Sequence, residues 1–253
     1  MRNSVRRGSA FIALSFMTVL AACAAPVGDE LNGVDPVEGA AAIDESEAED
    51  MEVSAPAESD VPAVSDMQLA AAPKGLWIST SEVMALPMSG AAWEKVKSAA
   101  NGLSGKADLS DNNSDHDIET LAAAYVAVRT GDAAMRTKTI KNIETVYASG
   151  YERVLEMSRN IQAYIIAADL IGPAGWDSAK FKTFVRALAT KPLSGHSGGG
   201  NLLATAQLSA NNWGCHSRAA IALIGLYTQD ATLVNAAVEA QKAFVSGEGG
   251  KLK

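Results

Sequence analysis

Residues 211–218 read NNWGCHSR and bring together side chains that can bind a polar ligand or transfer a proton. They include the side chains of Asn211, Asn212, Trp213, His216 and Arg218. Asn is a favoured N-cap residue, so one of the two amides is expected to cap a helix that begins near Trp213. The other amide can then face a polar ligand in a cleft, together with the imidazole. The alternatives are core packing for the indole, a structural or solvent-facing role for the imidazole, and pairing with a carboxylate inside the fold for the guanidinium.

A second polar group lies within the apolar segment 154–172. It consists of Arg159, Asn160 and Tyr164, and the last two are one helical turn apart, so they share a face. Two roles are open for this group, a buried network that ties helices together or the lining of a cleft. His116 stands among acidic residues at the start of another predicted helix, and it is expected at the surface.

Hydrophobic residues recur at helical spacing from about residue 89 onwards, and no segment alternates as a strand does. The segment 154–172 is apolar on most sides, which indicates an inner helix packed between others. The predicted fold is therefore all-α, with antiparallel helical hairpins joined by short turns. The glycine-rich loop at 191–201 lacks the final Lys-Ser/Thr of a P-loop, so nucleotide binding is not expected. The predicted helices span residues 89–102, 114–131, 132–150, 154–172, 176–190, 212–230 and 231–247.

The first 22 residues have the organisation of a secretory signal peptide. A basic start precedes an apolar run at 10–22, which is too short to span a bilayer comfortably. The stretch from Leu20 to Cys23 resembles the lipobox of bacterial lipoproteins, which implies that Cys23 is lipidated; an ordinary signal peptide is the alternative. The protein is then anchored to a bacterial membrane, in the periplasm or at the cell surface. Cys215 would be the other cysteine, which excludes an intramolecular disulfide and a metal site of paired cysteines.

The segment that follows the predicted anchor is strongly acidic. Residues 24–72 contain 13 acidic residues and no Lys or Arg, and the whole chain carries a formal charge of −8. A composition so rich in charge and so poor in aromatic residues predicts a disordered tether. Three regions are expected: a signal peptide at 1–22, an acidic linker at 23–73 and a helical domain at 74–253.

Four segments, in this order, resemble the alginate-lyase-like proteins of the α/α-toroid polysaccharide lyases. They read GLWISTSEVMALPMSGAAWEKVKSAA (75–100), LAAAYVAVRTGD (121–132), RNIQAYIIAADLIG (159–172) and NNWGCHSRAAIALIGLYTQD (211–230). The resemblance implies that the helical hairpins form part of an (α/α) toroid, either an incomplete or a complete ring. It also implies a cleft for an acidic polysaccharide, with no metal, no other cofactor and no nucleic-acid partner.

The resemblance further implies β-elimination at a uronic acid, in a polysaccharide such as alginate. In that reaction a base removes the proton next to the carboxylate, and the enzyme must neutralise the carboxylate with hydrogen-bond donors. Asn211 and Asn212 would donate to the carboxylate, and His216 would accept the proton. The substrate-binding residues would be Arg159, Asn160, Tyr164, Trp213 and Arg218. The competing interpretation is a non-catalytic glycan-binding or cell-envelope lipoprotein that retains part of the lyase fold.

Overall fold

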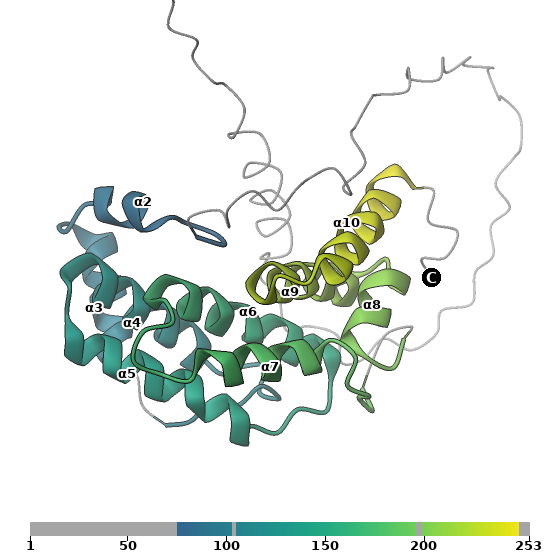
Figure 1. Cartoon of the computed structure of the whole chain (residues 1–253), viewed down its shortest axis with the longest axis horizontal. Helices are drawn as coiled ribbons and strands as arrows, with labels where there is room; N and C mark the ends of the chain where they lie inside the picture. Colours follow the sequence, from purple (N-terminus) through teal and green to yellow (C-terminus); the bar gives the residue numbers. More distant parts are fainter. Residues whose placement is uncertain (1–74, 103–104, 196–198, 248–253) are drawn as a thin grey trace, which may run out of the picture.

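The computed structural model describes residues 75–102, 105–195 and 199–247, and within these residues the protein is all-helical (Figure 1). The predicted signal peptide at 1–22, the lipidated Cys23 and the linker at 23–73 lie outside the described residues. The helices are α2 (Thr80–Ala85), α3 (Ala91–Gly102), α4 (His116–Thr130), α5 (Ala133–Glu144), the 3₁₀ helix η2 (Thr145–Ala148), α6 (Val154–Ile171), α7 (Ser178–Leu188), α8 (Leu202–Leu208), α9 (Asn212–Thr228) and α10 (Ala231–Ser246).

The helix α6 lies at the centre of the packing. It packs against α4 on one side and α9 on the other, and α3 and α10 continue the row beyond these two neighbours. The helix α5 packs on α4 and α6, whereas α7 lies against α9. We refer to α4, α6 and α9 as the central row. The predicted inner helix at 154–172 is thereby confirmed, because nearly every side chain of α6 is buried.

The helices α6 and α9 run in the same direction. The side-chain amide of Gln162, in the middle of α6, donates to the backbone oxygen of His216, in the second turn of α9, at 3.4 Å. Near the last turns of the two helices, the Asp169 carboxylate interacts electrostatically with Tyr227. The two contacts follow the same order along both helices, so both N-termini lie at one end of the row.

The helix α4 has the same direction as α6. Asp117 in its first turn feels the charge of Arg159, which lies in the second turn of α6. Towards the other end, Trp77 contacts the Tyr125 ring of α4 edge-on, while the adjacent Leu76 donates its backbone N–H to Asp169 of α6. All three helices of the central row therefore begin at the same end, which we call the N-terminal end of the row.

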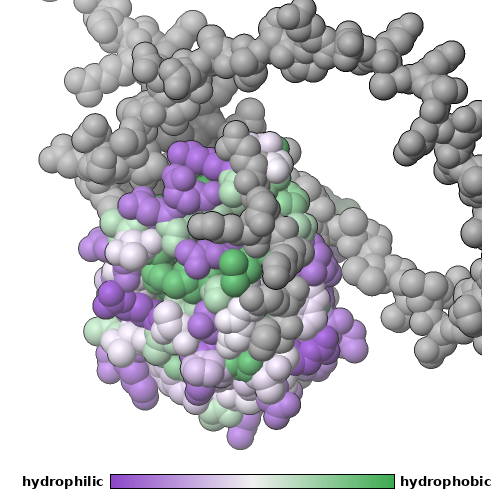
Figure 2. Space-filling view, turned by 90° about the vertical axis from the view of Figure 1, so that its right-hand side faces the viewer, coloured by the Kyte–Doolittle hydropathy of each residue, from purple (hydrophilic) through white to green (hydrophobic). Residues whose placement is uncertain are grey.

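The core between these helices is aliphatic and closely packed. Met157, Ile161 and Ile165 of α6 and Ile221 and Ile224 of α9 are wholly buried. Burying one such side chain stabilises the fold by about 1.5–3 kcal/mol. The central row is therefore held together mainly by apolar contact, and α10 completes it on the side shown in Figure 2, where hydrophobic residues gather in one band among hydrophilic ones.

The predicted helices are found with several ends shifted by one or two residues, with one change of helix type and with two additions. The predicted helix 132–150 changes at Glu144 into the 3₁₀ helix η2. The helices α2 and α8 were not predicted, because six and seven residues are too few to show a helical stripe. Both nevertheless have a cap at their start, Ser79 for α2 and Asn201 for α8. None of the helices in the described part of the chain is long and apolar enough to span a membrane.

Gly214 allows α9 to begin close against the end of α8. A Cβ atom at this position would lie 1.9 Å from the backbone oxygen of Ser209, far inside van der Waals contact. We therefore expect Gly214→Ala to lower the free energy of unfolding by about 2 kcal/mol, because the backbone of α8 or α9 must shift. Urea denaturation followed by circular dichroism measures this change.

Gly102→Ala is the matched control for Gly214→Ala. Gly102 is also helical, and a Cβ atom there would meet only the side-chain oxygen of Glu119, at an ordinary 3.6 Å. We expect a change within about 0.5 kcal/mol for this control. Equal effects of the two substitutions would contradict the close approach at Gly214.

Candidate functional site

The N-terminal end of the row collects most of the residues selected from the sequence. The first turns of α9 carry Asn211 to His216, and the first turns of α6 carry Arg159 and Asn160. The first turn of α4 adds Asp117. Helices that start at one end bring these polar groups together although up to 99 residues separate them in the chain.

Asn211 is the N-cap of α9, as one of the two amides was predicted to be. Its side-chain oxygen accepts from the backbone N–H groups of Trp213 and Gly214, at 3.1 and 3.4 Å. Asn212 is the first residue of the helix. Its side-chain oxygen also lies 3.0 Å from the N–H of Trp213, and its side chain is exposed at the end of the row. Asn212 therefore remains the amide that can reach a ligand.

His216 is half-buried in the second turn of α9. Burial, and to a smaller extent the charge of Arg159, lowers the pKa of its imidazole to about 4. The ring is therefore neutral at neutral pH and can accept a proton. Its low pKa also makes it a weak base, so it needs help from a nearby cation that stabilises the developing negative charge.

Arg159 is the exposed guanidinium at the N-terminal end of the row. It donates to the side chain of Asn112, in the loop before α4. It interacts electrostatically with Asp117 of α4 and with His216 of α9, so it lies between the two outer helices of the central row. An exposed guanidinium beside a neutral imidazole is a suitable partner for a carboxylate.

Asn160 and Tyr164 point into the protein, where they form the buried network that was one of their two predicted roles. The Asn160 amide donates to the backbone oxygens of Asp108 and Asp111, at 3.1 and 2.9 Å. The Tyr164 hydroxyl shares a hydrogen bond of 2.8 Å with Nδ1 of His116. Only 1% of the Tyr164 surface is exposed, and burial raises its pKa above the usual value. These contacts attach α4 and its preceding loop to α6.

The prediction that His116 lies at the surface is wrong. The residue is 5% exposed, and Thr120 donates to its backbone oxygen at 2.6 Å. Burial lowers the pKa of its imidazole, against a smaller opposing effect of Asn142. The ring is hydrogen-bonded to the hydroxyl of Tyr164 inside the protein. This partner is 48 residues away in the chain, so the acidic residues next to His116 could not indicate it.

Arg218 is buried and lies away from any open surface of the site, with 2% of its area exposed. Its guanidinium donates to the backbone oxygens of Ala206 and Ser209, at 3.2 and 3.0 Å, and to the side-chain oxygen of Gln241 at 3.0 Å. It also lies 4.5 Å from the ring centroid of Phe244. Arg218 thus joins α8, α9 and α10 inside the fold, but its partners are carbonyl and amide oxygens and not the carboxylate that was expected.

Trp213 is half-buried at the start of α9, and a cation covers its ring. The Arg153 guanidinium lies 5.3 Å from the ring centroid and forms an ion pair with Glu156 at 2.8 Å. Sequence reasoning did not single out Arg153, Glu156 or Asp117. An Arg immediately before a helix and acids in a first turn look like ordinary surface charges, so only their burial and partners distinguish them.

Asp117 is a buried carboxyl at the N-terminal end of the row. Burial raises its pKa to about 6, although two backbone N–H groups and Arg159 oppose this shift. Its Oδ1 atom has no hydrogen-bond partner. Groups with raised pKa values and unpaired oxygens are frequent at functional sites, which adds Asp117 to the candidates.

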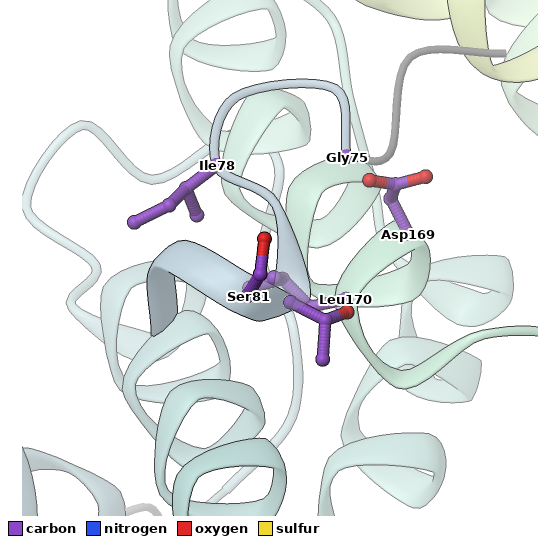
Figure 3. A pocket seen from close by; sticks show the side chains of 6 residues that line it. Gly75, Ile78, Ser81, Asp169 and Leu170 are labelled. Atoms are coloured by element: carbon purple, nitrogen blue, oxygen red, sulfur yellow. The ribbon is translucent and has the colours of Figure 1, made fainter. Parts of the chain in front are cut away.

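The pocket in Figure 3 lies at the opposite end of α6. Its volume is about 390 Å³, and its lining residues are Gly75, Ile78, Thr80, Ser81, Asp169 and Leu170. Asp169 points towards the segment at Gly75 and accepts the N–H of Leu76 at 2.7 Å, so it fastens this segment to α6. In the described part of the chain, no group of three or more His, Cys, Asp or Glu side chains is placed to hold a metal ion.

The two amides of α9 can be separated by substitution. We expect Asn211→Ala to lower the free energy of unfolding by about 1 kcal/mol, because it removes the cap of the helix. Asn212→Ala is expected to change it by less than about 0.5 kcal/mol, because Asn211 still accepts from Trp213. Chemical denaturation measures both values, and a larger loss for Asn212→Ala would show that the cap is assigned to the wrong amide.

The raised pKa of Asp117 predicts a pH-dependent stability. An unfolded Asp has a pKa of about 3.9, so folding to a state with a pKa of about 6 favours the protonated carboxyl. This contribution to stability is present below about pH 4 and is lost as the pH rises through about 6. Asp117→Asn mimics the protonated form, and we expect it to raise the free energy of unfolding by about 2 kcal/mol near pH 7 but little near pH 4.

Glu239→Gln is the control for Asp117→Asn, because Glu239 is an exposed acid in α10 paired with Lys242. It is expected to leave the pH dependence of stability unchanged. Thermal or urea unfolding of both variants and the wild type, at several pH values, makes the comparison. A constant difference between Asp117→Asn and the wild type across this range would contradict the buried titration.

Comparison of the chain with known proteins finds no matching family model, no matching curated protein and no matching solved structure. The kind of ligand that the N-terminal end of the row binds must therefore be inferred from the chemistry of the side chains that lie there. An exposed guanidinium, an exposed amide, a neutral imidazole and a half-buried indole lie there, and this set suits an anionic ligand better than a cationic or apolar one.

Proposed function

We propose that the protein is a polysaccharide lyase-like protein that binds a uronate-containing polysaccharide, such as alginate, at the N-terminal end of the row. The observation that carries this proposal is the neighbourhood of Arg159 and His216. The charge of Arg159, a permanent cation able to hold a carboxylate, acts on an imidazole that is neutral at neutral pH. β-Elimination at a uronate needs these two functions together.

The arrangement of the helices supports a relation to the (α/α) toroids. The chain alternates between helices of the central row and helices that pack outside it, since α5 lies between α4 and α6 in sequence and α7 lies between α6 and α9. In our proposal each pair forms an antiparallel hairpin, and the described helices form part of a toroid. The parallel inner helices then present their N-termini, with the partial positive charge of the helix dipole, to an anionic chain.

The proposed reaction assigns one step to each residue. Arg159 and Asn212 donate to the uronate carboxylate and draw electron density from the adjacent carbon. His216 takes the proton from that carbon, the electron pair forms a double bond to the next carbon, and the bond to the glycosidic oxygen breaks. The leaving oxygen receives a proton from the imidazolium or from water. The products are an unsaturated uronate and a new sugar hydroxyl, and the sequence of steps requires no cofactor.

A second candidate function is glycan binding without turnover, in a cell-envelope lipoprotein. It is favoured by the weak basicity of His216 and by the position of Tyr164, which is buried against His116 and cannot reach a ligand. In both cases the proposed partner is an acidic polysaccharide. In both cases we also propose a lipid anchor at Cys23 that holds the protein at a bacterial membrane, in the periplasm or at the cell surface.

The two candidates are distinguished by His216→Ala and Arg159→Gln. If His216 is the base, His216→Ala is expected to lower the rate of elimination at least about 100-fold while binding stays within about threefold. Arg159→Gln is expected to weaken binding about tenfold, because a charge-assisted hydrogen bond is lost. The ultraviolet absorbance of unsaturated uronates measures the reaction on alginate and other polyuronates, and calorimetry measures binding.

The pH dependence and a control variant complete the test. Since His216 must be neutral to accept a proton, wild-type kcat/KM is expected to fall as the pH drops through about 4. Lys242→Gln, which removes an exposed cation from α10, is expected to bind and react as the wild type does. Binding without any unsaturated product would support the glycan-binding candidate, and absence of polyuronate binding by the wild type would overturn both.

A further inference from the structure

We propose that the pocket at the C-terminal end of α6 binds a primary ammonium ion, that is, a protonated amine on a short aliphatic chain, with Asp169 as its counter-ion. The pocket has a volume of about 390 Å³, which is typical of sites for small molecules. It lies at the end of the central row opposite to Arg159 and His216, so this inference goes beyond the proposed function and does not depend on it.

The lining of the pocket combines hydrogen-bond acceptors with aliphatic side chains. The carboxylate of Asp169 and the hydroxyls of Thr80 and Ser81 supply the acceptors. The aliphatic side chains are those of Ile78 and Leu170, and no Lys or Arg is among the described residues that line the pocket. A ligand that carries N–H donors, a positive charge and a few methylene groups matches this lining, whereas a carboxylate or a phosphate would be repelled by the charge of Asp169.

The carboxylate of Asp169 keeps acceptor capacity for a ligand. Its Oδ2 atom accepts the backbone N–H of Leu76 at 2.7 Å, which is its one hydrogen bond within the described part of the chain. The Oδ1 atom is not among the buried oxygens that lack a partner, so it is open to the pocket or to solvent. An ammonium group that enters the pocket can therefore donate to Asp169 without displacing Leu76.

The surroundings of Asp169 favour a cation. Burial raises the pKa of its carboxyl, although the N–H of Leu76 and the charge of Lys182 oppose this shift. Burial therefore destabilises the charged carboxylate, and a bound ammonium ion would stabilise it. Asp169 also lies in the last turn of α6, where the helix dipole places partial negative charge.

The cations that the protein itself places near this end have other partners. The Lys182 ammonium lies 5.3 Å from the centroid of the Tyr227 ring, and it is not in an ion pair with Asp169. Arg136 donates to the backbone oxygen of Ile171 at 3.0 Å, so it satisfies the end of α6 and not the carboxylate. The counter-ion of Asp169 can therefore come from a ligand.

The α2 side of the pocket offers hydroxyl oxygens and not an anion site. The Ser79 hydroxyl accepts the N–H of Glu82, and the Glu82 carboxylate accepts the N–H of Ser79, so a capping box already satisfies the start of α2. Figure 3 shows Ser81 on α2 and Asp169 at the end of α6, with the segment 75–78 leading from beside Asp169 to α2. Because both side chains line one pocket, an ammonium group can find acceptors on both sides.

Titration of the full chain with n-butylammonium chloride tests this inference. The backbone amide NMR signals of residues 75–78 report binding at the pocket, with sodium chloride keeping the ionic strength constant. The wild type is expected to bind n-butylammonium at least about tenfold more tightly than n-butanol, which lacks the charge, or n-butyltrimethylammonium, which lacks the N–H donors. Butyrate is expected to leave these signals unchanged, because Asp169 repels an anion.

Asp169→Asn removes the charge of the counter-ion but keeps an oxygen for the N–H of Leu76. We expect it to weaken binding of n-butylammonium at least about tenfold, because the charge-assisted hydrogen bond is lost. Glu239→Gln is the matched loss of an exposed acid from α10, and binding is expected to stay within about twofold of the wild type.

A second variant keeps the test decisive if Asp169→Asn unfolds. Ser81 is exposed, so the fold is expected to tolerate Ser81→Lys, which adds an ammonium group of the chain itself at the pocket. This group is expected to compete for Asp169 and to weaken binding of n-butylammonium at least about tenfold. Ser98→Lys, on the exposed side of α3, is the matched gain of charge, with binding expected within about twofold of the wild type. Circular dichroism checks the helical fold of each variant.

Three outcomes would overturn the inference. The first is that the wild type binds n-butylammonium no better than n-butanol, and the second is that neither Asp169→Asn nor Ser81→Lys weakens binding. The third concerns Lys74, which precedes Gly75 in the sequence and lies outside the described residues. If Lys74→Gln binds n-butylammonium and the wild type does not, the pocket serves a lysine of the chain itself. Polyuronate binding at the N-terminal end of the row is measured separately, so either proposal can fail while the other holds.

Discussion

The burial of α6 between α4 and α9 is the constraint on which the rest of the structure depends. A helix with neighbours on both sides can place few polar groups in water, and an unpaired buried polar group costs about 1–3 kcal/mol. Asn160, Tyr164 and Asp169 of α6 therefore each hold a segment from elsewhere in the chain. They bind the loop before α4, the start of α4 and the segment before α2 respectively. The polar residues of the central helix thus determine where the surrounding loops lie.

The same constraint is incompletely met at the N-terminal end of the row. The side chains of His116, Asp117 and Glu156 each retain one buried nitrogen or oxygen without a partner, and all three lie in the first turn of α4 or α6. Buried unpaired groups are rare in native proteins and often mark places where function competes with stability. Their position next to Arg159 and Arg153 gives a physical reason to look for the ligand at this end.

The sequence was informative where local signals and packing agree. The all-round apolar character of 154–172 predicted an inner helix, and nearly every side chain of α6 is buried. An Asn at the start of α9 was expected as its cap, and Asn211 fills that role. The short helices α2 and α8 were not predicted, although the capping box formed by Ser79 and Glu82 could have indicated α2.

The site was less accessible to sequence reasoning, because exposure depends on partners that are distant in the chain. His116 and Arg218 illustrate this in opposite ways. Acidic neighbours suggested a surface position for His116, yet Tyr164 holds it inside. The polar segment around Arg218 suggested a ligand, yet Gln241 and two backbone oxygens of α8 and its following turn surround the guanidinium.

The contrast between Arg218 and Arg159 shows how burial decides which cation can bind a ligand. Both lie early in a helix of the central row, and both were candidates for the same polysaccharide. The N–H donors of Arg218 are bound inside the fold. Hydrogen bonds to two backbone carbonyl oxygens and to the amide oxygen of Gln241 replace the water that the buried guanidinium has lost. Arg159 has one described hydrogen-bond partner, Asn112, and its exposed side chain can exchange water for a carboxylate at little structural cost. Binding energy at this end of the protein therefore has to come from Arg159 and from groups equally open to solvent.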